Sequence, residues 1–79
     1  MTLENFLDFA KGLVGRNRGL QKRDFRTLHV SQLNGEFEGW IECKRATKMN
    51  GAIFRVSYSS ELNDWAVSQY NRSPFEIRN

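Results

Sequence analysis

The chain contains few of the residues that disulfide bonds, catalysis and membrane insertion require. Its 79 residues include one cysteine, one histidine and one proline. Because Cys43 has no partner for an internal disulfide, we expect a reducing, cytoplasmic environment. The apolar stretch over residues 3–14 is interrupted by Glu4, Asp8 and Lys11. It is therefore neither a signal-peptide core nor a membrane span, and we expect no membrane partner.

Three turn signals divide the second half of the chain into strand-like runs. They are Asn34-Gly35, Asn50-Gly51 and Asn63-Asp64, and each follows an apolar residue. Asn-Gly and Asn-Asp tolerate the positive φ angles of the type I′ turn, which joins two strands through a two-residue loop. The sequence therefore predicts a four-stranded antiparallel meander.

An amphipathic helix precedes these strands. Apolar residues recur every three or four positions over residues 3–14, with Thr2 as a predicted N-cap and Gly15 as a predicted stop. If each loop has two residues, Cys43 lies opposite Tyr58, and the sheet has one apolar face for the helix to cover. The residues predicted on that face are Leu28, Val30, Phe37, Ile41, Cys43, Ala52, Phe54, Val56, Tyr58, Leu62, Trp65 and Val67.

We therefore predict a single compact α+β domain over residues 1–79, with the N-terminal helix packed on one face of a four-stranded antiparallel β-meander. Residues 60–71 also fit a helical stripe, which would change the order to α-β-β-β-α; we favour the strand. The tip at residues 45–48 is expected to overhang the core or to contain a bulge. After Pro74, Phe75 and Ile77 are expected to form a short edge strand or a docked tail.

Positive charge is concentrated in a basic connector, residues 16–26. This segment has five basic residues and one acid, a net charge of +4, whereas the other 68 residues have seven basic and eight acidic residues, a net charge of −1. The segment is either a solvated loop whose first arginines favour the helix C-terminus, or a loop that contacts anions. The candidate anion or nucleic-acid contacts are Arg16, Arg18, Lys22, Arg23 and Arg26.

No catalytic or metal site can be assembled from the sequence. The predicted register places Cys43 on the helix-covered face and His29 on the open face, where we expect it to stack on Trp40, so no thiol–imidazole pair forms. Along a strand, Glu38 and Glu42 are roughly 13 Å apart, which is too far for one metal ion. A charge-balanced, solvated face explains these glutamates better. We predict no enzymatic activity, no metal and no cofactor.

The open face of the sheet is the predicted partner surface. Trp40 is its central residue, and Trp, Tyr and Arg dominate the energetics of binding interfaces. An exposed residue with no role is the alternative explanation for Trp40. The predicted partner-binding residues are Trp40, Tyr70, Arg55, Ile53 and His29.

Two functions remain possible at this point. The first is a small non-enzymatic effector, a monomer or homodimer, that binds and occludes a protein or a ribonucleoprotein through the open face and the basic segment. The second is a nucleic-acid-binding protein that uses residues 16–26. The glutamates on the open face favour the first, because they would repel phosphates. Small size, lack of catalytic groups and the helix-plus-meander build resemble inhibitors carried by phages and mobile elements, anti-CRISPR proteins among them, at the level of fold alone.

Overall fold

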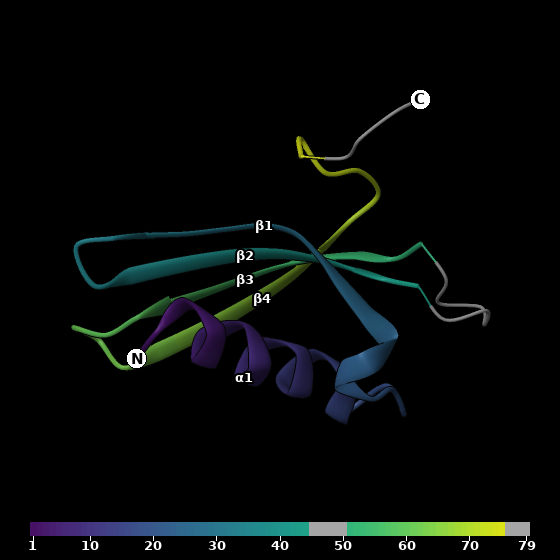
Figure 1. Ribbon diagram of the computed structural model, residues 1–79, viewed down its shortest axis with the longest axis horizontal. Helices are drawn as coiled ribbons and strands as arrows, with labels where there is room; N and C mark the ends of the chain where they lie inside the picture. The colour runs from purple at the N-terminus through teal and green to yellow at the C-terminus, as the bar shows by residue number, and fades with distance from the viewer. Residues whose placement is uncertain (45–50, 76–79) are drawn as a thin grey trace.

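The computed structural model describes residues 1–44 and 51–75, and it shows one N-terminal helix against a four-stranded antiparallel sheet (Figure 1). The order of the strands, β1-β2-β3-β4, confirms the predicted α+β meander. Because the last element is a strand, the α-β-β-β-α alternative is wrong. The elements are α1 (Leu3–Arg16), the 3₁₀ helix η1 (Lys22–Asp24), β1 (Phe25–Leu33), β2 (Glu36–Cys43), β3 (Ile53–Ser59) and β4 (Asp64–Tyr70). Within the described ranges, no helix has the length and apolar character needed to cross a membrane.

Helix α1 begins as predicted but ends later. The Thr2 hydroxyl oxygen accepts a hydrogen bond from the Asn5 N–H at 3.0 Å, which confirms the N-cap. The prediction that Gly15 stops the helix is wrong, because the helix continues to Arg16. Gly15 is buried, and its carbonyl accepts from the N–H groups of both Arg18 and Leu20. The chain reverses at Gly19, whose φ of +68° is the left-handed conformation that glycine adopts readily.

The three hairpins differ in loop length. The first is the predicted two-residue turn: Leu33 pairs with Glu36, and Asn34 and Gly35 have φ angles of 53° and 82°. In the third hairpin Ser59 pairs with Asp64, so its loop has four residues and the predicted two-residue turn is wrong.

The second hairpin also departs from the predicted register. Phe37, not Cys43, lies opposite Tyr58. Cys43 instead lies beside Ala52 and donates its N–H to the Ala52 carbonyl at 2.9 Å. The prediction for the tip at residues 45–48, like the first part of the Asn50-Gly51 turn, falls outside the described residues.

The side chains of β2, β3 and β4 nevertheless lie on the faces predicted for them, because both register errors are shifts by an even number of residues. Tyr58 pairs with position 37 instead of 43, a difference of six, and Trp65 pairs with position 58 instead of 62, a difference of four. Side chains alternate with a period of two along a strand, so an even shift keeps each of them on its face. Leu62 is the exception: it lies in the turn and is 73% exposed, so its predicted place in the core is wrong.

A β-bulge in β1 corrects a second part of the prediction. The register shifts between Thr27 and His29, so that Thr27 pairs with Ile41 and Leu28 is the extra residue. The predicted face of Thr27 is therefore wrong, and Leu28, which has no partner in the register, is not among the residues of the core cluster. As a result Phe25, which the predicted pattern left out of the core, lies opposite Cys43 and is buried.

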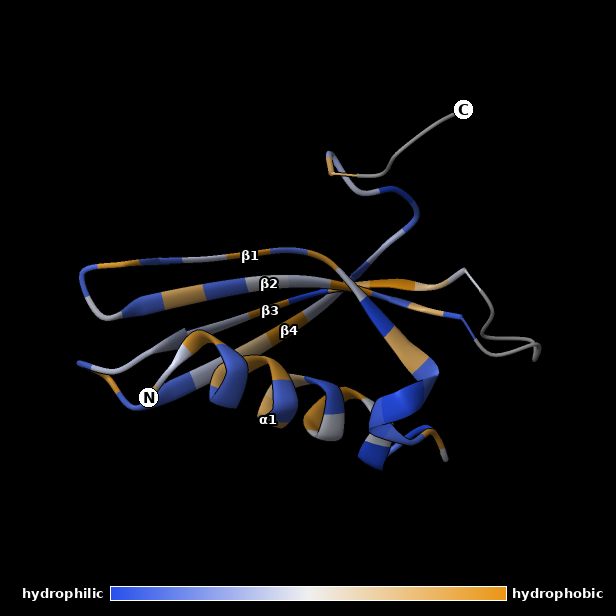
Figure 2. Cartoon of the chain, viewed as in Figure 1, coloured by the Kyte–Doolittle hydropathy of each residue, from blue (hydrophilic) through white to orange (hydrophobic). Residues whose placement is uncertain are grey.

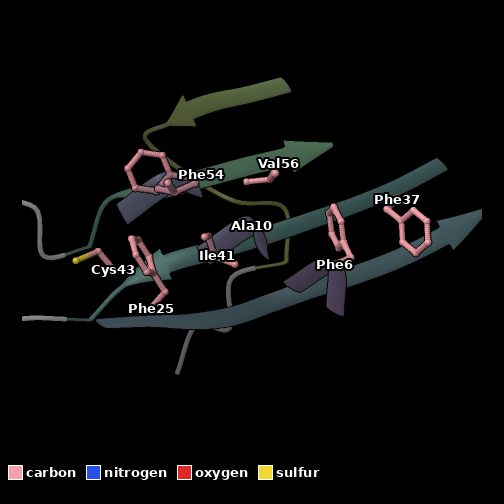
Figure 3. Close-up of a cluster of buried hydrophobic side chains, with 9 residues drawn as sticks. Phe6, Ala10, Phe25, Phe37, Ile41, Cys43, Phe54 and Val56 are labelled. Atoms are coloured by element: carbon pink, nitrogen blue, oxygen red, sulfur yellow. The ribbon is translucent and has the colours of Figure 1, made fainter. Parts of the chain in front are cut away.

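The core lies between α1 and the inner face of the sheet, defined as the face that α1 covers (Figure 3). Phe6 is fully buried in this core and stacks on Phe37 and Trp65, at ring distances of 5.3 and 5.6 Å. Opposite it, Gly39 leaves room for this ring, since a Cβ there would lie 2.9 Å from the Phe6 side chain. The buried core residues are Phe6, Ala10, Val14, Phe25, Phe37, Ile41, Cys43, Phe54 and Val56.

Candidate functional site

The outer face of the sheet, opposite α1, is not open at its centre. Trp40 is 6% exposed, so the prediction of an exposed tryptophan is wrong. The chain beyond β4 passes to the side of the sheet opposite α1 (Figure 1), and Phe75 lies edge-on to Trp40 at 5.9 Å. Tyr70 contacts the same indole at 5.0 Å. His29 stacks on Phe75 at 3.8 Å and not on Trp40 as predicted. Phe75 thus confirms a docked tail, and Ile77 lies outside the described residues.

Two of the glutamates on the outer face, Glu38 and Glu42, are paired with arginines. The Trp40 indole N–H donates to the Glu38 carboxylate at 2.6 Å, and the Arg55 guanidinium donates to it at 3.1 Å. The Trp40 hydrogen bond lowers the pKa of Glu38; partial burial opposes this shift, and Arg55 reinforces it. The Arg26 guanidinium donates to Glu42 at 2.6 Å. The charge balance that the sequence predicted is therefore present for Glu38 and Glu42, whereas Glu36 forms no ion pair within the described residues.

The predicted partner residues do not form one exposed patch. Trp40 and Ile53 are buried, and His29 and Arg55 are half-buried. Tyr70, at 42%, is the one classed as exposed. The interior of this cluster therefore contributes to the stability of the fold, and only its rim is available to a partner.

Three of the five predicted anion contacts have partners inside the molecule. Arg18 donates to the Val14 carbonyl at 2.8 Å, and its guanidinium lies 4.8 Å from the centre of the Phe54 ring, so it covers the core at the end of α1. The Lys22 ammonium contacts Asp8 at 2.7 Å, and Arg26 pairs with Glu42. Arg16 and Arg23 are exposed and form no ion pair with any other residue in ranges 1–44 and 51–75.

The structure assembles a different basic set around an open groove of about 430 Å³. We call it the basic groove and define it by Lys11 of α1, Lys22 and Arg23 of η1, and Lys44 at the end of β2. The Lys44 N–H donates to the Asp24 carbonyl at 2.8 Å, which places Lys44 beside η1. Figure 2 shows hydrophilic residues over this short helix.

Positive charge in the basic groove exceeds negative charge. Its lining also includes Glu4 and Asp8, so four cations face two carboxylates. The Asp8 carboxylate pairs with Lys22. The other three cations, Lys11, Arg23 and Lys44, make no ion pair within the part of the chain that the structure describes. Leu7 and Phe25 supply apolar lining.

Sequence reasoning missed Lys11 and Lys44 because they lie outside the basic segment. Lys11 is three residues after Asp8 on the helix, and helical positions three apart are neighbours. The spacing alone places Lys11 beside Asp8. The ion pair between Asp8 and Lys22, which the structure shows, then places Lys11 near the basic segment. Lys44 had no comparable signal, because its position depends on where β2 ends and on the contact with η1.

The groups with chemical reactivity are kept apart. Cys43 is 1% exposed within the inner core, whereas His29 lies on the outer face, as the sequence predicted. Among the described residues, no three His, Cys, Asp or Glu side chains are grouped as metal ligands would be. Comparisons with protein-family models, curated proteins and solved structures gave no match to this chain.

Proposed function

We propose that this protein is a non-enzymatic nucleic-acid-binding protein that contacts the phosphate backbone through the basic groove. One observation carries the proposal: three cations without internal partners come from α1, η1 and the end of β2 and line the same groove. Contacts from lysine and arginine to phosphates supply most of the sequence-independent affinity of proteins for nucleic acid. Because the fold fixes the three elements relative to one another, it also fixes the spacing between the three residues. A ligand with several anionic groups at regular intervals, such as a phosphate backbone, can contact more than one of them at once.

Lys22 can join this contact at small cost. Its ion pair with Asp8 is exposed, with 53% and 65% of the two side chains accessible to solvent. Exposed pairs of this kind contribute about 0–1 kcal/mol, so a phosphate can replace the carboxylate. Arg18 differs, because its guanidinium lies over the Phe54 ring in the core. We therefore assign Lys11, Lys22, Arg23 and Lys44 to the contact and leave Arg18 to the fold.

The alternative is an effector that occludes a protein or a ribonucleoprotein through the outer face. It is supported by the exposed rings of Tyr70 and Phe75, at 42% and 37% of their surface. Aromatic residues of this kind are enriched at binding hot spots. In this case Trp40 supports the two rings from beneath and is not the anchor itself.

A charge-matched pair of variants tests the proposal. Arg23→Gln with Lys44→Gln removes two charges from the basic groove, and Gln32→Glu with Leu62→Glu lowers the net charge equally at exposed positions in β1 and in the turn before β4. Affinity for a labelled DNA duplex is measured by fluorescence anisotropy at about 0.1 M salt. We expect the groove variant to bind on the order of 60-fold more weakly, since each phosphate contact is worth about eightfold at this salt concentration. The control is expected to change less than about threefold.

Two results would overturn the proposal. Equal losses in the groove variant and in the control would show that net charge, and not the groove, attracts nucleic acid. No measurable binding by the wild-type protein would remove nucleic acid as its ligand and favour the outer face. Urea unfolding of each variant verifies that all of them are folded.

A further inference from the structure

The two edges of the sheet are protected to different degrees. Edge strands carry unpaired N–H and C=O groups, and natural proteins block them with charges, bulges or covering segments. β1 has such features: it contains Arg26 and the bulge after Thr27, and Phe75 stacks on its His29. In the described residues, β4 has no bulge and little charge. Its seven residues include one charge, Asp64, at the first position, and its register with β3 is regular.

The surface beside β4 is also apolar on the side of α1. Val67 is 37% exposed, and Phe9 is 46% exposed while it stacks on Trp65 at 4.5 Å. The exposed apolar surface therefore continues from β4 onto the helix. On the outer side, Ala66 and Ser68 are small, so another strand can approach without displacing large side chains.

We propose that β4 pairs with β4 of a second copy of this chain, antiparallel about a two-fold axis at Val67, to form a continuous eight-stranded sheet. In this register the two Val67 residues face each other, Ala66 lies opposite Ser68, and Trp65 lies opposite Gln69. Asp64 falls opposite Tyr70, so no two like charges meet. An isologous pairing needs a segment that is complementary to itself, and β4 meets this requirement. The proposal does not depend on nucleic-acid binding.

The self-pairing register favours a second copy over a foreign strand. A foreign strand added to an edge is selected by side-chain pockets that alternate along it. β4 instead presents small or apolar side chains at its centre and places its one charge at the end, where self-pairing keeps the two copies of Asp64 apart. The new contact would cover exposed Val67 from both copies.

The first test is the mass of the full chain in solution, measured by sedimentation equilibrium from about 5 to 500 µM. We expect a concentration-dependent dimer. Val67→Lys places two ammonium groups opposite each other and is expected to abolish the dimer, since like charges in a cross-strand pair repel. Gln32→Lys introduces the same charge at an exposed position of β1 and is expected to leave the dimer intact.

The second test concerns register. Residues opposite each other in an antiparallel pair have Cα atoms about 4.5–5.5 Å apart, which suits a disulfide. We expect Val67→Cys to form a covalent dimer under mild oxidation, whereas Ser31→Cys on β1 gives only the low yield of random collision. Cys43 does not compete, because it is 1% exposed. A wild-type protein that is monomeric throughout the range, or a dimer that Val67→Lys leaves unchanged, would overturn the proposal.

Discussion

The two ends of the sheet carry opposite charge. The end with the β1–β2 and β3–β4 turns, residues 31–38 and 57–66, has four acidic residues and no basic residue. At the other end, residues 16–26 have five basic residues and one acid, and Lys44 lies beside them. Figure 1 shows both turns at one end, and the C-terminal end of α1 with η1 at the other. The net charge of +3 therefore understates how strongly one end attracts anions.

The two ends also close the core differently. At the turn end, Tyr58 and Trp65 are half-buried aromatic residues whose rings are 4.5 Å apart. At the basic end, Phe25 packs edge-on to Phe54 at 6.2 Å, and Arg18 covers the Phe54 ring. One cation of the basic end, Arg18, thus packs against the core, while others remain unpaired at the surface. Proximity in sequence did not distinguish these two roles.

The largest effect on stability is expected from Phe54 at the basic end. The side chain is fully buried, so Phe54→Ala should lower the free energy of unfolding by about 3–5 kcal/mol. Leu33→Ala at the turn end is the control, because Leu33 is 74% exposed; it should cost less than about 0.5 kcal/mol. Urea unfolding measures both changes. Similar costs would mean that the core does not extend to the basic end as described.

A smaller effect is expected at Arg18. Arg18→Gln removes the contact with the Phe54 ring and the hydrogen bond to the Val14 carbonyl, and should cost about 1 kcal/mol. Arg16→Gln removes a neighbouring cation that has neither contact, and it should cost less than half as much. The two variants carry the same charge, so urea midpoints that coincide would show that helix-end electrostatics, and not the Phe54 contact, accounts for the role of Arg18.

The smallest effect is expected from Glu38 as a dependence of stability on pH. Its pKa is lowered in the folded state, chiefly by the Trp40 indole N–H. The stabilisation is therefore complete above the ordinary carboxyl pKa of about 4.3 and is lost as the pH falls through the lower, folded value. Because 35% of the side chain is exposed, we expect less than about 1 kcal/mol. The difference in unfolding free energy between wild type and Glu38→Gln should shrink below about pH 4; a constant difference would contradict this assignment.

The fold was predictable because its main signals are local. Alternation along the strands and the Asn-containing turns established the meander, and even errors in register left most residues on the correct face. Loop length was not predictable, because Asn63 adopts a positive φ of 51° in a four-residue loop as well as it would in a two-residue one. The bulge that moves Phe25 into the core had no signal in the sequence.

The candidate site was less predictable, because it depends on contacts between distant residues. Trp40 alternates correctly onto the outer face, but Tyr70 and Phe75 cover it. Lys44 reaches the basic groove through the hydrogen bond of its N–H to Asp24, twenty residues earlier in the chain. Arg16 and Arg18 each lie between Asn17 and a glycine in the sequence, yet only Arg18 covers the Phe54 ring.

The dependence of affinity on salt tests the central claim most directly. If Lys11, Lys22, Arg23 and Lys44 each neutralise one phosphate of a DNA duplex, log K against log salt concentration should have a slope near −3.6, from about −0.9 per contact. Arg23→Gln with Lys44→Gln should reduce the slope to about −1.8, and Gln32→Glu with Leu62→Glu should leave it near the wild-type value. A slope that the groove variant does not change would contradict phosphate binding by the basic groove.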